Sequence, residues 1–246
     1  MFKEDTIAAI TTGMSNAGVG IIRISGERAC EIVDKIFRAA NSKKKATTMK
    51  TYTAAFGGVY DGDEMKDEAI LLVMKAPHTY TCEDVCELQC HGGIVVLREI
   101  LDMIVRAGAR IAEPGEFTKR AFLNGRIDLS QAESVMDLIN AKNEFAARTS
   151  VEQLQGRLGD KVRDMREIIL YNVAFIESAL DDPEHYSLEG FPQKLHEIVD
   201  KLISDVDNLL STFDNGRVLS EGINTVIIGK PNAGKSSLLN MLLGEE

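Results

Sequence analysis

The sequence lacks any continuous apolar run of about 18 residues or more, so it predicts no membrane-spanning helix and no contact with a membrane. Its first residues also lack the apolar stretch of a secretory signal peptide, and we therefore expect a cytoplasmic protein. The four cysteines are too few for a disulfide framework and fit a reducing compartment. Positive charge is scarce: 28 Lys and Arg against 38 Asp and Glu give a net charge of −10, which argues against a generally basic nucleic-acid surface.

What the sequence does contain is typical of a globular protein, with 44% hydrophobic and 27% charged residues over 246 positions. Strand-like and helix-like patterns alternate unevenly in the first part, which predicts an α+β domain over residues 1–126. We expect strands at 6–10, 20–24, 51–60, 68–74, 84–90 and 110–112, with helices at 27–37 and 94–107.

From about residue 127 to residue 221 the pattern becomes entirely helical, which predicts a second, all-helical domain. Ser130 followed by Glu133 has the spacing of a capping box, so a helix is expected to begin there. No proline and only two glycines occur between residues 130 and 180, which predicts two long helices or one broken helix. After a polar loop at 181–186, a further helix is expected from about Pro192 to Phe213.

Residues 222–246 change character again and carry a phosphate-binding motif. A β-branched run, Ile223–Ile228, predicts a strand, and an apolar helix is expected at Leu238–Leu243. Between them, Gly229–Ser236 matches the G-x-x-x-x-G-K-[ST] pattern of a P-loop, in which the lysine reaches the phosphates and the hydroxyl can bind Mg²⁺. Asn232 within the loop either faces the phosphates or a cation or simply tolerates the turn.

Only 17 residues follow Gly229, whereas a nucleotide-binding α/β domain usually needs about 150 residues. We therefore expect this chain to be a fragment of a longer protein, containing only the start of a nucleotide-binding P-loop domain. As it stands, it is not expected to hydrolyse nucleotide.

Charged residues of the first domain lie where packing alone would not require them: Arg23, Glu87 and an arginine in the segment 113–129. Arg23 interrupts an apolar strand, and Glu87 lies in another. Such a set suits a ligand that has hydrogen-bond donors along one edge and also carries negative charge. An internal Arg23–Glu87 ion pair, or exposed strand ends, explains the same pattern, and the sequence leaves these alternatives open.

Cys82, Cys86 and Cys90, with His91 beside them, raise the question of a metal site. Their four-residue spacing matches no common zinc or iron–sulfur pattern, and eight residues of extended strand are too long to wrap one ion. We expect the thiols to fill apolar space instead.

The segments around these residues resemble the family of bacterial tRNA-modification GTPases known as MnmE or TrmE, and the resemblance extends over the whole chain. It implies a folate-binding N-terminal domain of the aminomethyltransferase type, which dimerises, then a helical domain with a GTPase domain inserted into it. The matching segments are 5–9, 20–26, 78–85, 87–93, 113–129, 131–133 and 229–240.

The resemblance also implies binding sites. The folate, as 5-formyl- or 5,10-methylene-tetrahydrofolate, is assigned to Arg23, Glu87 and Arg126, the last of which is often lysine in relatives. Potassium is assigned to Asn232 and Mg²⁺ to Ser236. The residues assigned to GTP are Asn232, Ala233, Gly234, Lys235, Ser236 and Ser237.

The function implied by the resemblance is GTP-driven modification of carbon 5 of the wobble uridine in certain tRNAs. A tetrahydrofolate derivative supplies the one-carbon unit, and a flavin-dependent partner of the GidA/MnmG type takes part. The acidic net charge fits a protein whose partner does much of the tRNA holding. The alternatives are a stand-alone folate-dependent aminomethyltransferase-like enzyme and a regulatory GTPase switch that has no use for folate.

Overall fold

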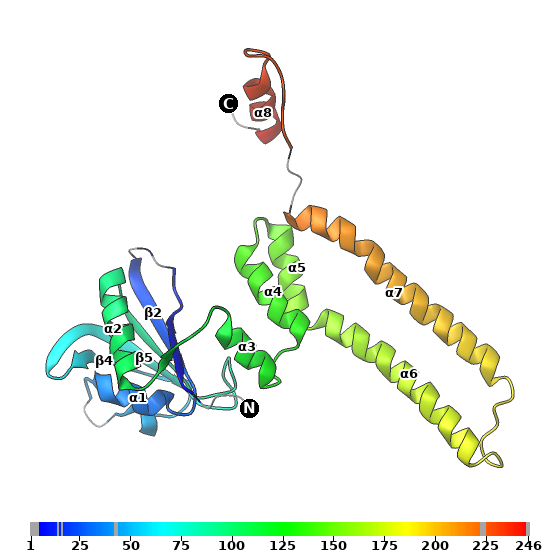
Figure 1. The fold of residues 1–246 in the computed structure, drawn as a ribbon, viewed down its shortest axis with the longest axis horizontal. Coiled ribbons are helices and arrows are strands. Elements are labelled where there is room, and N and C mark those ends of the chain that lie inside the picture. The colour runs from blue at the N-terminus through cyan, green and yellow to red at the C-terminus, as the bar shows by residue number, and fades with distance from the viewer. Residues whose placement is uncertain (1–4, 14, 16, 42–43, 222–224, 245–246) are drawn as a thin grey trace. The chain divides into compact units, whose positions relative to one another are not determined.

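A computed structural model describes residues 5–13, 15, 17–41, 44–221 and 225–244 of the chain. These residues fall into two compact units, Met1–Val135 and Met136–Glu246 (Figure 1). The first unit contains the sheet, and the second consists of helices and connecting segments.

The first unit is built on a seven-stranded sheet in the order β3-β4-β5-β6-β2-β1-β7. Neighbouring strands are antiparallel except for β1 and β7, which run parallel. The strands are β1 (Ile7–Ile10), β2 (Ala17–Ser25), β3 (Phe37–Ala39), β4 (Thr53–Asp61), β5 (Glu64–Met74), β6 (Val85–Gly92) and β7 (Arg110–Ile111). The six predicted strands are thus confirmed, whereas β3 was not predicted.

Helices α1 (Ala29–Ile36) and α2 (Ile94–Ala107) pack against each other and against the sheet. Both helices were predicted, although Phe37 continues into β3 instead of ending α1. The 3₁₀ turn η1 (Ala46–Thr48) and helix α3 (Glu116–Leu123) were not predicted. The core between the helices and the sheet includes Ile22, Ile24, Ile32, Val33, Leu71, Val73, Leu88, Ile100 and Ile104.

The register of the central strands decides which side chains share a face of the sheet. Ile22 of β2 lies opposite Leu88 of β6, which lies opposite Leu71 of β5, and all three are fully buried. Because side chains alternate along a strand, the next residues, Arg23 and Glu87, point to the other face. These two charged residues therefore lie on the face of the sheet away from α1 and α2.

Helix α4 (Leu129–Asn140) begins at a different cap from the predicted one. The Asp128 carboxylate accepts a hydrogen bond from the Gln131 backbone N–H at 2.8 Å, and the Gln131 side-chain oxygen accepts from the Asp128 N–H at 2.9 Å. This reciprocal pair is a capping box two residues earlier than the predicted Ser130–Glu133 box. Ser130 instead donates its hydroxyl to Asp128.

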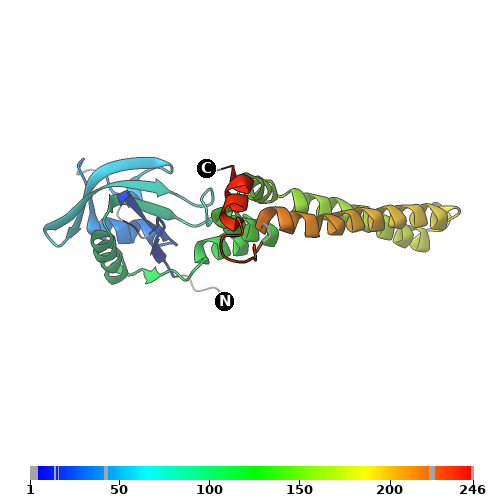
Figure 2. The same ribbon diagram turned by 90° about the horizontal axis from the view of Figure 1, so that it is seen from above.

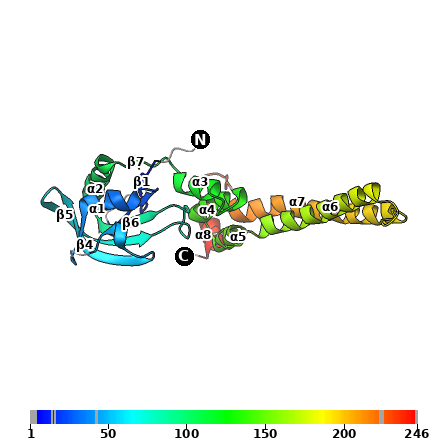
Figure 3. The same ribbon diagram turned by 90° about the horizontal axis from the view of Figure 1, so that it is seen from below.

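The second unit contains α5 (Glu144–Leu154), α6 (Arg157–Asp181), α7 (Phe191–Glu221) and α8 (Lys235–Leu243). Three helices, rather than one or two, occupy residues 129–181. One of the breaks lies at Gly156, whose φ of 86° only glycine adopts without strain. Helices α6 and α7 run side by side as a long antiparallel pair (Figures 2 and 3).

The predicted strand before the P-loop is wrong for the residues that are described. Residues 225–228 form no strand, and Ile223 and Asn224 lie outside the described ranges. The physical reason is that a β-strand needs a hydrogen-bonded neighbour, and none pairs with this segment among the described residues. The helix after the loop is confirmed, but α8 begins at Lys235, earlier than expected.

Within the ranges that the structure describes, no helix combines the length and the apolar character that crossing a membrane requires.

Candidate functional site

Arg23 and Glu87 lie directly opposite each other on β2 and β6 and form an ion pair. The Arg23 Nε donates to Glu87 Oε1 at 2.7 Å, and both side chains are largely but not fully buried, with 26% and 12% exposure. The internal ion pair that the sequence left open is therefore present. It uses one carboxylate oxygen of Glu87, and Oε2 has no partner among the described residues.

Two aromatic side chains surround this pair. The Arg23 guanidinium lies 5.4 Å from the ring centroid of Tyr80 and 5.5 Å from that of Phe117. Arg126 also lies over Tyr80, at 4.8 Å. The structure thus places Arg23 and Arg126 over one ring, and Glu87 is connected to them through its ion pair with Arg23. Guanidinium groups within about 6 Å of an aromatic centroid attract the negative face of the ring.

The segment that carries Tyr80 is fastened by polar contacts. The Tyr80 hydroxyl forms a 2.9 Å hydrogen bond with the hydroxyl of Thr118 on α3. The Asn124 side chain donates to the carbonyl of Thr81 at 2.6 Å, and the Thr79 hydroxyl donates to the carbonyl of Glu83 at 2.7 Å. Tyr80 is therefore held from the α3 side as well as by its own loop.

A cluster of ion pairs anchors α3 itself. Arg120 of α3 bonds Glu83 of the loop at 3.0 Å and Asp5 at 2.7 Å, while Arg110 bonds Glu116 at 2.7 Å. The Arg110 guanidinium, with help from Arg120 and the Glu113 N–H, lowers the pKa of Glu116 to about 2 despite its burial. The same arginines, Arg110 first, lower the pKa of Asp5. The carboxylates therefore remain charged and hold α3 against the loop.

The charges in the site are divided unequally. Arg23 is neutralised by Glu87, whereas no carboxylate lies within ion-pairing distance of Arg126 in the described part of the chain. Glu87 Oε2 can accept a hydrogen bond from a donor edge, and Arg126 can attract an anionic group. The site is therefore suited to a planar ligand with donors at one end and negative charge at the other.

Sequence reasoning missed Tyr80 and Phe117 as members of this site. Both lie in segments that carried the family resemblance, 78–85 and 113–129, but aromatic residues are ordinary core fillers. The available signal was their position beside charged residues, which became informative only once β2, β6 and α3 were placed together.

The P-loop residues lie in the second unit. Lys235 Nζ donates to the carbonyls of Gly229 at 3.0 Å and Lys230 at 2.7 Å, so the lysine closes over its own loop. Asn232 and Gly234 have φ values of 61° and 78°, in the left-handed region that curves the backbone of such loops. Ala233, Ser236 and Ser237 are exposed, and the two serines lie in the first turn of α8.

Two of the three thiols fill apolar space as predicted, whereas Cys82 is half-buried and lies outside the core. Cys86 and Cys90 face the core, and burial raises the pKa of Cys90 to about 12. Among the described residues, no group of His, Cys, Asp and Glu has the arrangement of a metal site. His91 instead pairs with Asp67 at 2.5 Å, which raises the pKa of the imidazole.

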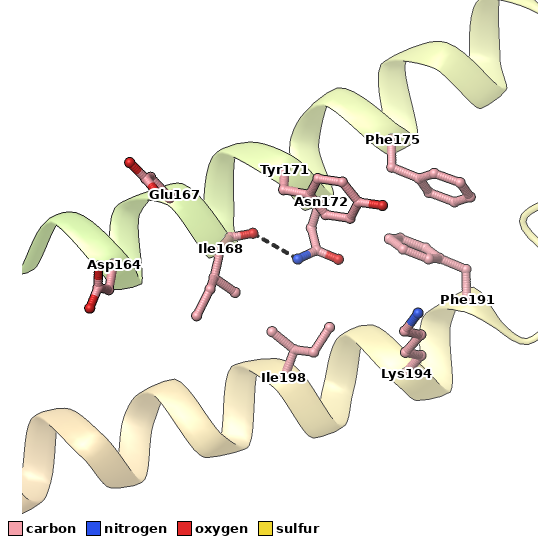
Figure 4. A pocket seen from close by; sticks show the side chains of 9 residues that line it. All are labelled: Asp164, Glu167, Ile168, Tyr171, Asn172, Phe175, Phe191, Lys194 and Ile198. Carbon is pink, nitrogen blue, oxygen red and sulfur yellow. Dashed lines mark hydrogen bonds between the residues drawn. The ribbon is translucent and has the colours of Figure 1, made fainter. Parts of the chain in front are cut away.

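The second unit has a pocket of its own, of about 640 Å³, between α6 and α7 (Figure 4). The rings of Phe175 and Phe191 face each other there with centroids 4.8 Å apart. The nearly buried Asn172 donates its amide to the Ile168 carbonyl of its own helix at 2.7 Å. The pocket combines apolar and acidic side chains, with Lys194 from α7.

Comparison with known families agrees with this architecture. Residues 6–126 match the family described as GTP-binding protein TrmE N-terminus, and residues 129–241 match the MnmE helical domain. The class of protein is thus one in which an α+β domain is followed by a helical domain, here with a P-loop sequence motif at its end. The chain belongs to the MnmE family, also called TrmE.

Similar proteins come from several bacteria, and each is named a tRNA modification GTPase. The chain is 54% identical over 99% of its length to the protein from Lachnoclostridium phytofermentans. It is 49% identical over 98% to that from Caldicellulosiruptor saccharolyticus and 48% identical over 100% to that from Acetivibrio thermocellus. In each case it covers 53% of the relative, so the chain spans about half the length of these proteins.

Proposed function

We propose that this chain provides the folate-binding part of a GTPase that modifies tRNA. In this proposal residues 1–126 form a folate-binding and dimerisation domain, 127–221 a helical domain and 222–246 the beginning of a GTPase domain. The whole protein acts on carbon 5 of the wobble uridine, together with a flavin-dependent partner of the GidA/MnmG type, in the cytoplasm. The relatives named tRNA modification GTPase support tRNA modification by a GTPase as the general function.

The observation that carries the proposal is that Arg23 and Arg126 both lie over the Tyr80 ring while Arg23 is paired with Glu87. The residues fit 5-formyl- or 5,10-methylene-tetrahydrofolate, because a pterin edge offers adjacent N–H donors to Glu87 and the glutamyl tail is anionic. When bound, the folate supplies the one-carbon unit. The protein holds and orients it on the sheet face opposite α1 and α2.

Calorimetric titration of the chain with 5-formyl-tetrahydrofolate tests this assignment. Replacing Arg23 with Ala, or Glu87 with Gln, should reduce the affinity at least about tenfold, since each removes a charged hydrogen bond. Arg38→Ala is a matched control, because Arg38 also lies over a ring, that of Tyr60, but on the edge strand β3, away from β2 and β6. The assignment fails if the folded chain does not bind folate, or if Arg23→Ala and Glu87→Gln both bind like the wild type.

For the nucleotide, we propose that Asn232, Ala233, Gly234, Lys235, Ser236 and Ser237 bind GTP in the whole protein. Their backbone N–H groups and the Lys235 ammonium suit phosphate oxygens. Ser236 would hold Mg²⁺ and Asn232 would hold potassium, since hydroxyl and amide oxygens are suitable ligands for hard cations. Potassium-dependent nucleotide affinity of the whole protein, lost in Asn232→Ala, tests the potassium assignment.

We propose that the protein is a homodimer through its N-terminal domain. An apolar group on the sheet face that α1 and α2 leave open supports this: Phe56 of β4 lies opposite Ile70 of β5, and both are about half exposed. Sedimentation analysis should therefore find a dimer, and Phe56→Ser together with Ile70→Ser should shift it toward the monomer. If the double variant keeps the mass of the dimer at low protein concentration, the dimer contact lies elsewhere.

A further inference from the structure

Tyr80 occupies the centre of the candidate site without being one of its charged residues. Its ring lies within 5.4 Å of the Arg23 guanidinium and within 4.8 Å of that of Arg126. Arg23 has a second anchor, its bond to Glu87. For Arg126, which is exposed, the ring is the partner that the structure shows. Tyr80 therefore matters more for the orientation of Arg126 than for the orientation of Arg23.

The ring is itself fixed. Its hydroxyl bonds Thr118 at 2.9 Å, and Thr118 belongs to α3, which Arg120 fastens to the loop of Tyr80 through Glu83. Among the described residues, Thr118 forms no hydrogen bond with either guanidinium, so the Tyr80 ring is the side-chain link between Thr118 and the Arg126 guanidinium. The Arg126 backbone N–H is bonded separately to Ala121 of α3 at 2.9 Å. A chain of side-chain contacts thus runs from α3 through Tyr80 to Arg126, whose guanidinium has no carboxylate partner among the described residues.

We propose that Tyr80 is a positioning residue that determines specificity, an inference that rests on the proposed folate site. Tyr80 holds Arg126 in the orientation that binds the carboxylate end of the ligand. Arg23 and Glu87 form a locally neutral pair and recognise the donor edge of the heterocycle. The free charge of Arg126 recognises the anionic tail. Loss of the Tyr80 ring should therefore abolish the preference for a tailed ligand while leaving heterocycle binding largely intact.

The test compares two ligands, 5-formyl-tetrahydrofolate and 5-formyl-tetrahydropteroamide, in which a neutral primary amide replaces the glutamate so that the tail carries no charge. The wild type should prefer the glutamate-bearing ligand by about tenfold, as expected for a partly exposed charge-assisted contact. Tyr80→Leu should reduce this ratio to about one, with the affinity for the pteroamide changed less than about threefold. Arg126→Ala should have the same effect, and adding Tyr80→Leu to it should change the ratio no further.

The hydroxyl contact gives a second, milder test. Tyr80→Phe and Thr118→Val each remove the same hydrogen bond, so each should lower the ratio by about twofold to threefold, and the double variant should match the single ones. Tyr60→Leu, which removes the ring beneath Arg38, is the matched control and should leave both affinities unchanged. Unchanged melting temperatures show that the variants remain folded.

The outcomes separate this inference from the proposed function. If the wild type binds neither ligand, the folate site is wrong and the role of Tyr80 falls with it. If folate binds but Tyr80→Leu keeps the tenfold preference, the function stands and the positioning role is overturned. Equal losses for both ligands in Tyr80→Leu would also overturn it, because they would make Tyr80 a general packing residue.

Discussion

Cys82 has a backbone conformation that side chains bearing a Cβ rarely adopt, with a φ of 60°. It lies two residues after Tyr80 and within the loop whose Thr81 carbonyl and Glu83 carboxylate are bonded to α3. The left-handed turn at Cys82 is therefore part of how the loop presents the Tyr80 ring. Such conformations persist where surrounding contacts enforce them.

Replacing Cys82 with Gly should stabilise the protein by about 1 kcal/mol, because glycine adopts this φ without a Cβ penalty. Chemical denaturation of the two proteins measures the difference. Cys82→Ala is the control: it removes the thiol but keeps the Cβ, so it should bring no such gain. A similar gain from Ala would mean that the sulfur, and not the backbone, is the source of the strain.

The ion cluster at Glu116 makes stability depend on acid pH. Its pKa is about 2 in the folded protein, mainly through Arg110, below the ordinary value of 4.5. A lowered pKa stabilises the fold fully above the unfolded pKa, and the contribution is lost as pH falls through the window from about 4.5 to about 2. The shift corresponds to about 3 kcal/mol at most.

Urea unfolding between pH 2 and pH 6 tests this dependence, and Glu116→Gln should flatten the part of the curve below about pH 4.5. Glu64→Gln is the control, because the Glu64 carboxylate is mostly exposed beside Lys66. If both variants keep the acid loss seen in the wild type, other carboxylates must be responsible for it.

At the scale of elements, the start of α4 shows why one capping pattern prevailed over another. Two overlapping signals, Asp128 with Gln131 and Ser130 with Glu133, satisfy the same spacing rule. The structure selects the earlier one, in which both reciprocal bonds form. The position of α3 just before it limits where the chain can turn, and sequence spacing does not contain that information.

Asp128→Ala should therefore destabilise the protein by about 1 kcal/mol, the usual cost of losing an N-cap side chain. Ser130→Ala should cost less, since it removes only a hydroxyl that donates to Asp128. Thermal unfolding followed by circular dichroism compares the two. If Ser130→Ala destabilised the protein more than Asp128→Ala, the helix would begin at Ser130 in solution.

The strands and helices of the first unit could be predicted because their apolar residues alternate or recur at helical spacing. The register could not be predicted: nothing in the sequence states that Arg23 lies opposite Glu87. To predict the candidate site, one would need to know both this register and the position of α3, which places Phe117 beside Arg23. Hence the charged members were found from the sequence and the aromatic members were not.

At the scale of the whole molecule, the two units differ in how complete their sites are. The candidate folate residues all belong to the first unit, where sheet, loop and helix fix them. The P-loop residues follow a segment, 225–230, that forms neither strand nor helix. A P-loop binds phosphate tightly when a strand and a helix hold its backbone N–H groups toward one point.

We therefore expect the purified 246-residue chain to bind folate but not to hydrolyse GTP. Lys235 bonds the carbonyls of its own loop, and no strand supports that loop within the described residues, so the charge needed at the phosphates is not held in place. Phosphate release should not exceed that of Lys235→Ala, and folate affinity should be the same with and without Mg·GTP. GTP turnover that Lys235→Ala abolishes would contradict this prediction. It would show that the bound nucleotide alone is enough to order the loop, without a paired strand before it.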